Sequence, residues 1–245
     1  MKKIIIALVA LALPVMAIAS GGAHLDKADI DLSNKGSLQN GAKMYVNYCL
    51  GCHSLKYMSY ARMGKDLGLP DELVQENLMF TGKKIGEYMT ISMPAANAEK
   101  WFGVTPPDLS VIARSRGADW IYTYLRNFYV DDSRPFGVNN RVFESVGMPH
   151  VLSQLEGLKK PVYTTEKDEY GTDRQVLTGY EYITEGSMTP AEYDRQVRDL
   201  VNFLVYTGEP AKLVRYDLGI KVILFLLFFL IIAYLLKKEY WKDIH

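Results

Sequence analysis

Both cysteines of this 245-residue chain lie in one short run, Tyr48-Cys49-Leu50-Gly51-Cys52-His53. Residues three positions apart lie about one turn apart on a helix, which has ~3.6 residues per turn. Two thiols at that spacing can add to the two vinyl groups on one side of a haem, and the next histidine then lies under the iron. The run therefore predicts a covalent haem c site, with Cys49 and Cys52 as attachment points and His53 as an axial iron ligand.

Other roles for two cysteines at this spacing explain less of the run. A disulfide in an exported protein leaves the adjacent histidine without a purpose. A zinc site usually needs four ligands, and the sequence has no second cysteine pair; the spacing of His24 and His150 suggests no site. A thioredoxin-like redox pair needs a βαβ context that the sequence does not indicate. Haem attachment is the interpretation that uses all three residues.

The N-terminus has the features of a secretory signal peptide. Lys2 and Lys3 precede an apolar run from Ile4 to Leu13, and the small-residue sequence Ala17-Ile18-Ala19 follows. The apolar run is shorter than the ~20 residues that a membrane-spanning helix needs. We therefore predict a signal peptide over residues 1–20, with an uncleaved anchor helix as the alternative.

The C-terminus predicts a membrane anchor instead. Leu218 to Leu236 is long enough to cross a bilayer, and Lys221 near its start can extend its charge to the interface. The basic residues that follow the span predict a cytoplasmic end: Lys237, Lys238 and Lys242. We expect a periplasmic domain over 21–215, a transmembrane helix over 216–237 and a cytoplasmic tail over 238–245, in a bacterial inner membrane. A buried helix of a soluble protein is the alternative.

The formal net charge of zero argues against a nucleic-acid-binding protein. Six of the 28 basic residues and two of the 28 acidic residues lie in or beside the two apolar ends, which leaves 22 basic and 26 acidic residues between them. This mildly acidic middle predicts attraction of a basic partner, because complementary charge chiefly raises the rate of association.

Two helices carry the clearest local signals. Apolar residues recur at helical spacing from near Ser37 to the cysteine pair, and Gly41 within this stretch indicates close approach of another element. The run Thr189-Pro190-Ala191-Glu192 is a capping box that starts a second helix, closed by Gly208 and Pro210. We expect the second helix to pack on the first.

The middle of the chain is predicted to be less regular. A helical face runs from Trp120 to Phe128, and residues 133–150 form a long loop that holds Met148. The segment from Val162 to Tyr182 alternates threonine, tyrosine and valine with charge, which predicts a β-hairpin with Gly171 at its turn. The tip of this hairpin is acidic: Glu166, Asp168, Glu169 and Asp173.

The sixth iron ligand has several candidates. A methionine there raises the reduction potential and closes the site to oxygen, which suits an electron carrier. Met148 and Met93 both precede a proline, although most methionines only fill gaps in cores. Met148 is favoured because glycine and proline frame its loop. His150 is a third candidate, which would give two histidine ligands.

Haem propionates are costly to bury without partners. A guanidinium group binds a carboxylate through two hydrogen bonds, so Arg114 and Arg116 are candidates to pair with a propionate. For most other arginines a solvated surface position is the simpler interpretation.

Several of these features together resemble the cytochrome c1 family, the haem subunit of the bc1 complex. The features are the haem motif, Pro106-Pro107-Asp108-Leu109-Ser110 with the two arginines behind it, Gly147-Met148-Pro149, Met188-Thr189-Pro190, and the single C-terminal anchor with its basic end. They are spread over nearly the whole mature chain. The proline-proline-aspartate run and the anchored layout are more specific than the haem motif, which all c-type cytochromes share.

The resemblance implies a mainly α fold, in which a cytochrome c-like haem domain has long insertions and a small β-hairpin, plus one C-terminal transmembrane helix. It implies one covalent haem c with His53 and Met148 as axial ligands, and Arg116 or Arg114 near a propionate. It also implies partners: cytochrome b, the Rieske iron–sulfur protein that delivers electrons from quinol, and a soluble or tethered cytochrome c that accepts them. The chain on its own is then an electron carrier and no enzyme.

Two other functions stay open on the sequence alone. A tethered c-type cytochrome could deliver electrons to another oxidase or reductase. A haem-based sensor, which belongs to a different class, needs an open or weakly held sixth position.

Overall fold

The computed structural model describes residues 24–167 and 171–242. Its helices are α2 (Lys35–Tyr48), α3 (Tyr60–Leu67), α4 (Asp71–Asn77), α5 (Ala95–Phe102), α6 (Ile112–Ser115), α7 (Ala118–Leu125), α8 (Ser153–Glu156), α9 (Pro190–Gly208) and α10 (Lys212–Tyr240). Its strands are β1 (Leu55–Ser59), β2 (Tyr88–Met89), β3 (Phe128–Val130), β4 (Val138–Asn140), β5 (Gly157–Lys167) and β6 (Asp173–Glu185). The mainly α fold expected from the resemblance is confirmed. The predicted signal peptide lies outside the described residues.

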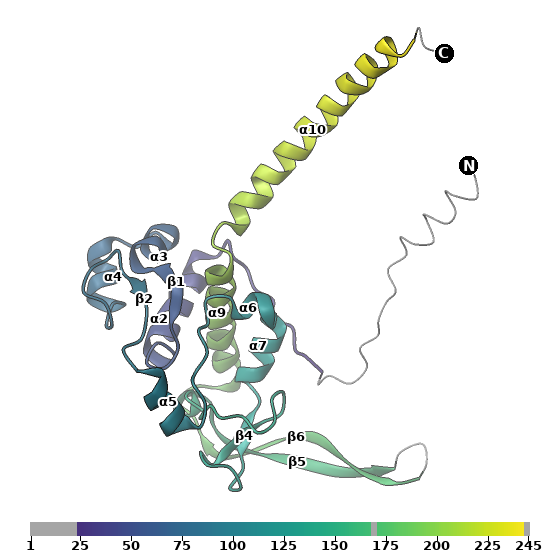
Figure 1. Ribbon diagram of the computed structural model, residues 1–245. Coiled ribbons are helices and arrows are strands. Elements are labelled where there is room, and N and C mark those ends of the chain that lie inside the picture. Colours follow the sequence, from purple (N-terminus) through teal and green to yellow (C-terminus); the bar gives the residue numbers. More distant parts are fainter. Residues whose placement is uncertain (1–23, 168–170, 243–245) are drawn as a thin grey trace.

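Helices α2 and α9 form the centre of the core and lie side by side (Figure 1). A Cβ atom added to Gly41 of α2 would lie 2.1 Å from the backbone oxygen of Asp199 in α9. The two backbones are therefore so close that only glycine fits at this position. Both predictions, the packing of these helices and the close approach at Gly41, are confirmed. The predicted capping box of α9 is also present, between Thr189 and Glu192.

The segment after α7 differs from the prediction. Phe128 does not continue the helix but begins β3, which pairs antiparallel with β4 inside the predicted loop. The apolar spacing of Phe128 matches the helix face before it, but α7 ends at Leu125 and the chain turns, with Arg126 N–H bonded to the Thr123 carbonyl. A strand of three residues is too short to show an alternating pattern.

The predicted β-hairpin is confirmed and is longer than expected. Strands β5 and β6 pair antiparallel from Gly157 opposite Glu185 to Lys167 opposite Asp173. The hairpin projects from the end of the body opposite α10 (Figure 1). Part of its predicted acidic tip, residues 168–170, lies outside the described residues.

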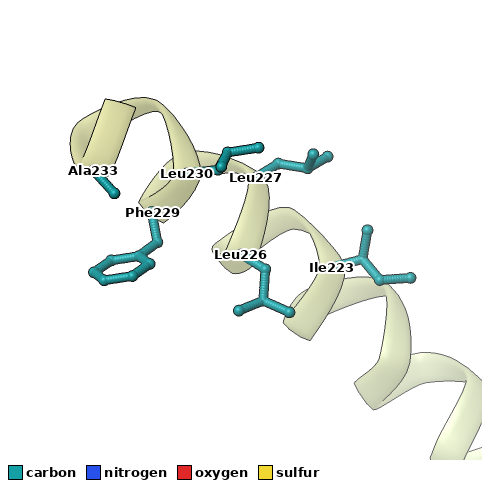
Figure 2. Close-up of a pocket in the computed structure, with 6 residues that line it drawn as sticks. All are labelled: Ile223, Leu226, Leu227, Phe229, Leu230 and Ala233. Carbon is teal, nitrogen blue, oxygen red and sulfur yellow. The ribbon is translucent and has the colours of Figure 1, made fainter. Parts of the chain in front are cut away.

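Helix α10 extends alone from the body and, among the described residues, is the one helix long and apolar enough to cross a membrane (Figure 1). None of its residues is buried by the rest of the chain. Figure 2 shows six side chains from this helix, all of them hydrocarbon: Ile223, Leu226, Leu227, Phe229, Leu230 and Ala233. A lone helix with such a surface fits a single-pass membrane anchor, because outside a membrane its large apolar surface would be exposed to water.

Candidate haem site

A cavity of about 400 Å³ lies between the haem motif, the proline-rich turn, α7 and the loop before α8. Cys49, His53 and Met148 all line it, although Met148 is far from the other two in the sequence. A smaller adjoining hollow of about 90 Å³ shares these three residues and adds Cys52. The remaining walls are largely apolar: Val104, Leu109, Ile112, Trp120, Ile121, Leu125, Val146, Leu200 and Leu204.

The haem motif is a tight turn at the end of α2. The N–H groups of Cys52 and His53 both donate to the Cys49 carbonyl, at 3.0 and 2.9 Å. The Tyr45 hydroxyl, one turn back in α2, donates to the His53 carbonyl at 2.5 Å. The position of His53 is therefore fixed by its own short segment of chain.

The imidazole of His53 is oriented by one hydrogen bond. Nδ1 lies 2.7 Å from the backbone oxygen of Pro107. A carbonyl oxygen can only accept, so Nδ1 carries the proton and Nε2 keeps a free lone pair, as an iron ligand requires. Burial lowers the pKa of His53, while the bond to Pro107 raises it. The dominant effect of burial favours the neutral ring, which is the ligating form.

The proline-rich turn is held where it can receive His53. The Asp108 carboxylate accepts from the N–H groups of Lys56 and Ser110, at 3.0 and 2.9 Å. Leu109 N–H donates to the Ser54 carbonyl at 2.9 Å. These bonds tie the turn to the start of β1, so that the Pro107 carbonyl is presented to the imidazole.

Met148 lies in a loop that contains no regular structure after β4. The hydroxyl of Tyr124 in α7 donates to its sulfur at 3.4 Å. Buried Asn140 holds the start of the loop, because its side chain donates to the Tyr124 carbonyl at 2.8 Å and accepts from Val142 N–H at 2.9 Å. The Met148 side of the cavity is thus fixed by α7 and by an asparagine.

The two other candidate ligands lie elsewhere. Met93 precedes Pro94 at the start of α5 and lines neither hollow. His150 is buried, its ring is stacked on Phe128 with centroids 4.9 Å apart, and its Nε2 lies 2.9 Å from a Glu156 carboxylate oxygen. Among the three candidates, only Met148 lines the cavity with His53.

The two candidate arginines differ in position. Arg116 lines the cavity, and its guanidinium carbon lies 5.1 Å from the centre of the Trp120 ring. It forms no ion pair with any residue in 24–167 or 171–242. Arg114 does not line the cavity, and its side chain packs beside Gly208 of α9. Arg116 is therefore the cation available to an acidic group in the cavity.

These residues fit a haem better than a bare metal ion. Within the described ranges, no group of three or more His, Cys, Asp or Glu side chains is arranged to hold a metal. The cavity instead offers one imidazole and one thioether, which suits a metal that brings its own equatorial ligands. Both cysteines are free. Burial raises the pKa of Cys49 to about 12 and also raises that of Cys52, so both thiols stay protonated.

The sequence patterns did not reveal every residue at the site. The helical spacing of Trp120 and Tyr124 predicts only a core face, and no pattern assigns a role to the asparagines of β4. The spacing of Tyr124 on α7 marks it only as apolar-facing. The partner of its hydroxyl comes from a loop that the spacing does not describe.

Cys49, His53 and Met148 line one apolar cavity, and Cys52 lines the adjoining hollow. Two thiols, an imidazole and a thioether are the donor set of a c-type cytochrome. With a helix that is able to cross a membrane, the chain has the features of a tethered c-type cytochrome. Comparison with known proteins narrows this class. The model of the cytochrome C1 family matches residues 30–244. The chain is 50% identical to cytochrome c1 of Allochromatium vinosum, over the full length of both proteins.

Two further relatives are similar to this chain over most of its length. A Nitrosomonas europaea protein named ammonia monooxygenase gamma subunit is 50% identical, over 95% of this chain and 94% of that protein. The mitochondrial cytochrome c1 haem protein of Schizosaccharomyces pombe is 24% identical, over 85% of this chain and 67% of that protein.

The chain belongs to the cytochrome c1 family. Its function is that of cytochrome c1 in the bc1 complex, an electron-transfer subunit of the respiratory chain. Membership implies haem c as the cofactor, which fits the donor set of the cavity. The resemblance found in the sequence is confirmed.

Proposed function

We propose that the chain carries one haem c, bound through Cys49 and Cys52, with His53 and Met148 as the two axial iron ligands. The haem supplies an iron that alternates between the ferric and ferrous forms. The observation that carries the proposal is the cavity that Cys49, His53 and Met148 line together. A relay with both axial positions filled has no open site for oxygen or for a signalling gas, so it favours electron transfer over sensing.

The chain's own residues keep both ligands in place. His53 is held through Pro107, and Met148 is held through Tyr124. Ligands that are already in position need little rearrangement when the charge on the iron changes. Fixed hydrogen bonds of this kind support rapid electron exchange.

We also propose that Arg116 pairs with a haem propionate. Its guanidinium is in the cavity wall and pairs with no described carboxylate. A cation–π contact with the Trp120 ring helps to hold the guanidinium at the cavity. Two parallel N–H bonds to a carboxylate need a guanidinium that is held in place.

A denatured-mass measurement with a pyridine haemochrome spectrum tests the attachment. The mature chain should carry the mass of one haem, and Cys49→Ala with Cys52→Ala should lose it. A haem that remains covalently bound to the double variant would contradict the proposed attachment.

Met148→Leu should change the low-spin spectrum and lower the reduction potential, because a sulfur ligand is lost. If spectrum and potential are unchanged, Met148 is not the ligand and Met93→Leu becomes the variant to examine.

For the partners, we propose that electrons arrive from the Rieske protein, in a complex with cytochrome b, and leave to a cytochrome c. Family membership supports this arrangement. Purification from detergent-solubilised membranes should recover a b-type cytochrome and an iron–sulfur protein with the chain. Their absence would favour the tethered carrier that serves another oxidase or reductase. Recovery of monooxygenase subunits would favour the assembly named for the Nitrosomonas relative.

For the topology, we propose that the haem domain lies in the periplasm and that α10 crosses the inner membrane with its C-terminus in the cytoplasm. Lys237, Lys238 and Lys242 follow the apolar part of α10, as the positive-inside rule requires of a cytoplasmic end. A fluorescent protein that matures only in the cytoplasm should be bright when fused to the C-terminus. A dark fusion with intact expression would reverse the orientation.

A further inference from the structure

One cation and four aromatic rings form a column, of which Arg116, Trp120 and Tyr124 line the cavity. The Arg116 guanidinium lies over Trp120, and the Trp120 ring is stacked on Tyr124, with centroids 5.0 Å apart and planes 8° from parallel. Phe128 packs edge-on against Tyr124 at 5.2 Å and is itself stacked on His150. The ring of Tyr124 is therefore held between Trp120 and Phe128.

The fixed ring directs one hydroxyl group at one sulfur atom. Tyr124 Oη lies 3.4 Å from Met148 Sδ. A thioether has no proton to give, so the tyrosine must be the donor. Burial raises the pKa of Tyr124, so the hydroxyl keeps its proton at neutral pH. The backbone of Tyr124 is also fixed, because its carbonyl accepts from the Asn140 side chain.

We propose that Tyr124 is a positioning residue that raises the reduction potential of the iron through Met148. The inference rests on the proposed function, since it needs Met148 as an axial ligand. A hydrogen bond to the sulfur draws electron density away from it. A poorer sulfur donor stabilises the electron-rich ferrous iron relative to the ferric iron, so the potential rises.

The same hydrogen bond should keep Met148 on the iron. The Met148 loop has no regular structure of its own, and the bond from Tyr124 ties the sulfur to a helix. Without it, the thioether can leave the iron more often, and an added ligand can take its place. The inference therefore predicts two readouts that a purely structural role in packing would not move together.

Tyr124→Phe tests the inference, because it removes the hydroxyl and keeps the ring stack. In full-length, detergent-solubilised protein with haem attached, the variant should remain six-coordinate and low-spin. The equilibrium constant for reduction of its iron should fall roughly threefold, because a hydrogen bond to a weak sulfur acceptor is at the low end of hydrogen-bond strengths. The reduction potential falls with this constant, and a tenfold change corresponds to about 59 mV for one electron. Imidazole should bind to the ferric variant faster than it binds to the ferric parent protein.

Tyr122→Phe is the matched control. Tyr122 is a buried tyrosine of the same helix that does not line the cavity, so losing its hydroxyl should leave potential and imidazole binding unchanged. Equal shifts in both variants would indicate a general effect of α7 and overturn the inference.

Met148→Leu separates this inference from the proposed function. If Met148→Leu alters the spectrum while Tyr124→Phe leaves the potential unchanged, the ligand assignment stands and the role of Tyr124 is wrong. If Met148→Leu alters nothing, the ligand assignment is wrong, and the inference fails with it.

Discussion

The two sides of the cavity are built in different ways. His53 follows directly from α2, whose packing against α9 forms the centre of the core. Met148 sits in a loop that is held by side chains from α7 and β4. Elements buried in the core open only with the whole domain, whereas loops held by a few bonds can open locally. His53 therefore shares the stability of the fold, while Met148 depends on a small set of polar contacts.

The largest effect should come from adding a side-chain atom at Gly41, where α2 contacts α9. Gly41→Ala adds a Cβ that would lie 2.1 Å from Asp199 O and 2.7 Å from Phe203 Cβ, so the helices must move apart. We expect a loss of about 3 kcal/mol or more in the free energy of unfolding, at the upper end of overpacking costs. Chemical denaturation of the holoprotein, followed by circular dichroism, measures it.

The control for this variant lies in the haem motif itself. An added Cβ at Gly51 meets no atom within 4 Å, so Gly51→Ala should change stability by no more than about 1 kcal/mol. If Gly41→Ala proves as mild as Gly51→Ala, the His53 side does not depend on the α2–α9 contact as argued.

A smaller and more local effect should follow Asn140→Ala. The Tyr124 carbonyl loses the bond from the Asn140 side chain but keeps the one from Asn127 N–H, and Val142 N–H loses its acceptor. A part-buried N–H left without an acceptor costs about 1–3 kcal/mol, so we expect a loss of about 1–3 kcal/mol in the free energy of unfolding. Because the loop is affected directly, carbon monoxide should bind the ferrous variant, and the covalent haem should remain.

Asn47→Ala is the matched control for this prediction. Asn47 is also an asparagine that donates to a backbone carbonyl, that of Lys43, but its bond is exposed on α2. We expect a change within about 0.5 kcal/mol and no binding of carbon monoxide. Carbon monoxide binding by both variants would mean that the Met148 loop is open for another reason.

In the turn that holds His53, Asp108→Ala should cost less. It removes the acceptor of two backbone N–H groups, those of Lys56 and Ser110, and we expect about 1–2 kcal/mol because the Lys56 bond is exposed to water. Met148 ligation should persist, since none of these bonds involves its loop. Loss of the methionine ligand with His53 still bound would contradict the separation of the two sides.

The same contrast explains what the sequence could predict. The haem motif, α2, α9 and the anchor depend on signals within a few residues: a contiguous motif, helical periodicity, a capping box and an apolar run. The asparagines of β4 act through contacts between distant segments, and polar residues near glycines usually indicate an exposed loop. The spacing of Phe128 predicts a continued helix, although it also fits a strand that packs on that helix.

Acidification should produce the smallest effect, and it should loosen the Met148 side. The Asp131 carboxylate accepts from the Ser133 hydroxyl and backbone N–H and from the Asn139 side chain. The carbonyl of that side chain in turn accepts from Ser145 N–H, just before Met148. The bonds from Ser133 and Asn139 lower the pKa of Asp131 below its ordinary value of 3.8.

A carboxylate with a lowered pKa stabilises the folded state above its ordinary pKa, and this contribution is lost as the pH falls through the lowered value. Met148 ligation should therefore weaken below about pH 3.8 in the parent, as followed by the low-spin spectrum. Asp131→Asn removes this titration, so its ligation should be weaker than the parent's at neutral pH and the two should converge in acid. Parallel pH profiles with a constant difference would show that Asp131 has no part in holding the loop, and the Met148 side would then depend on Tyr124 and Asn140 alone.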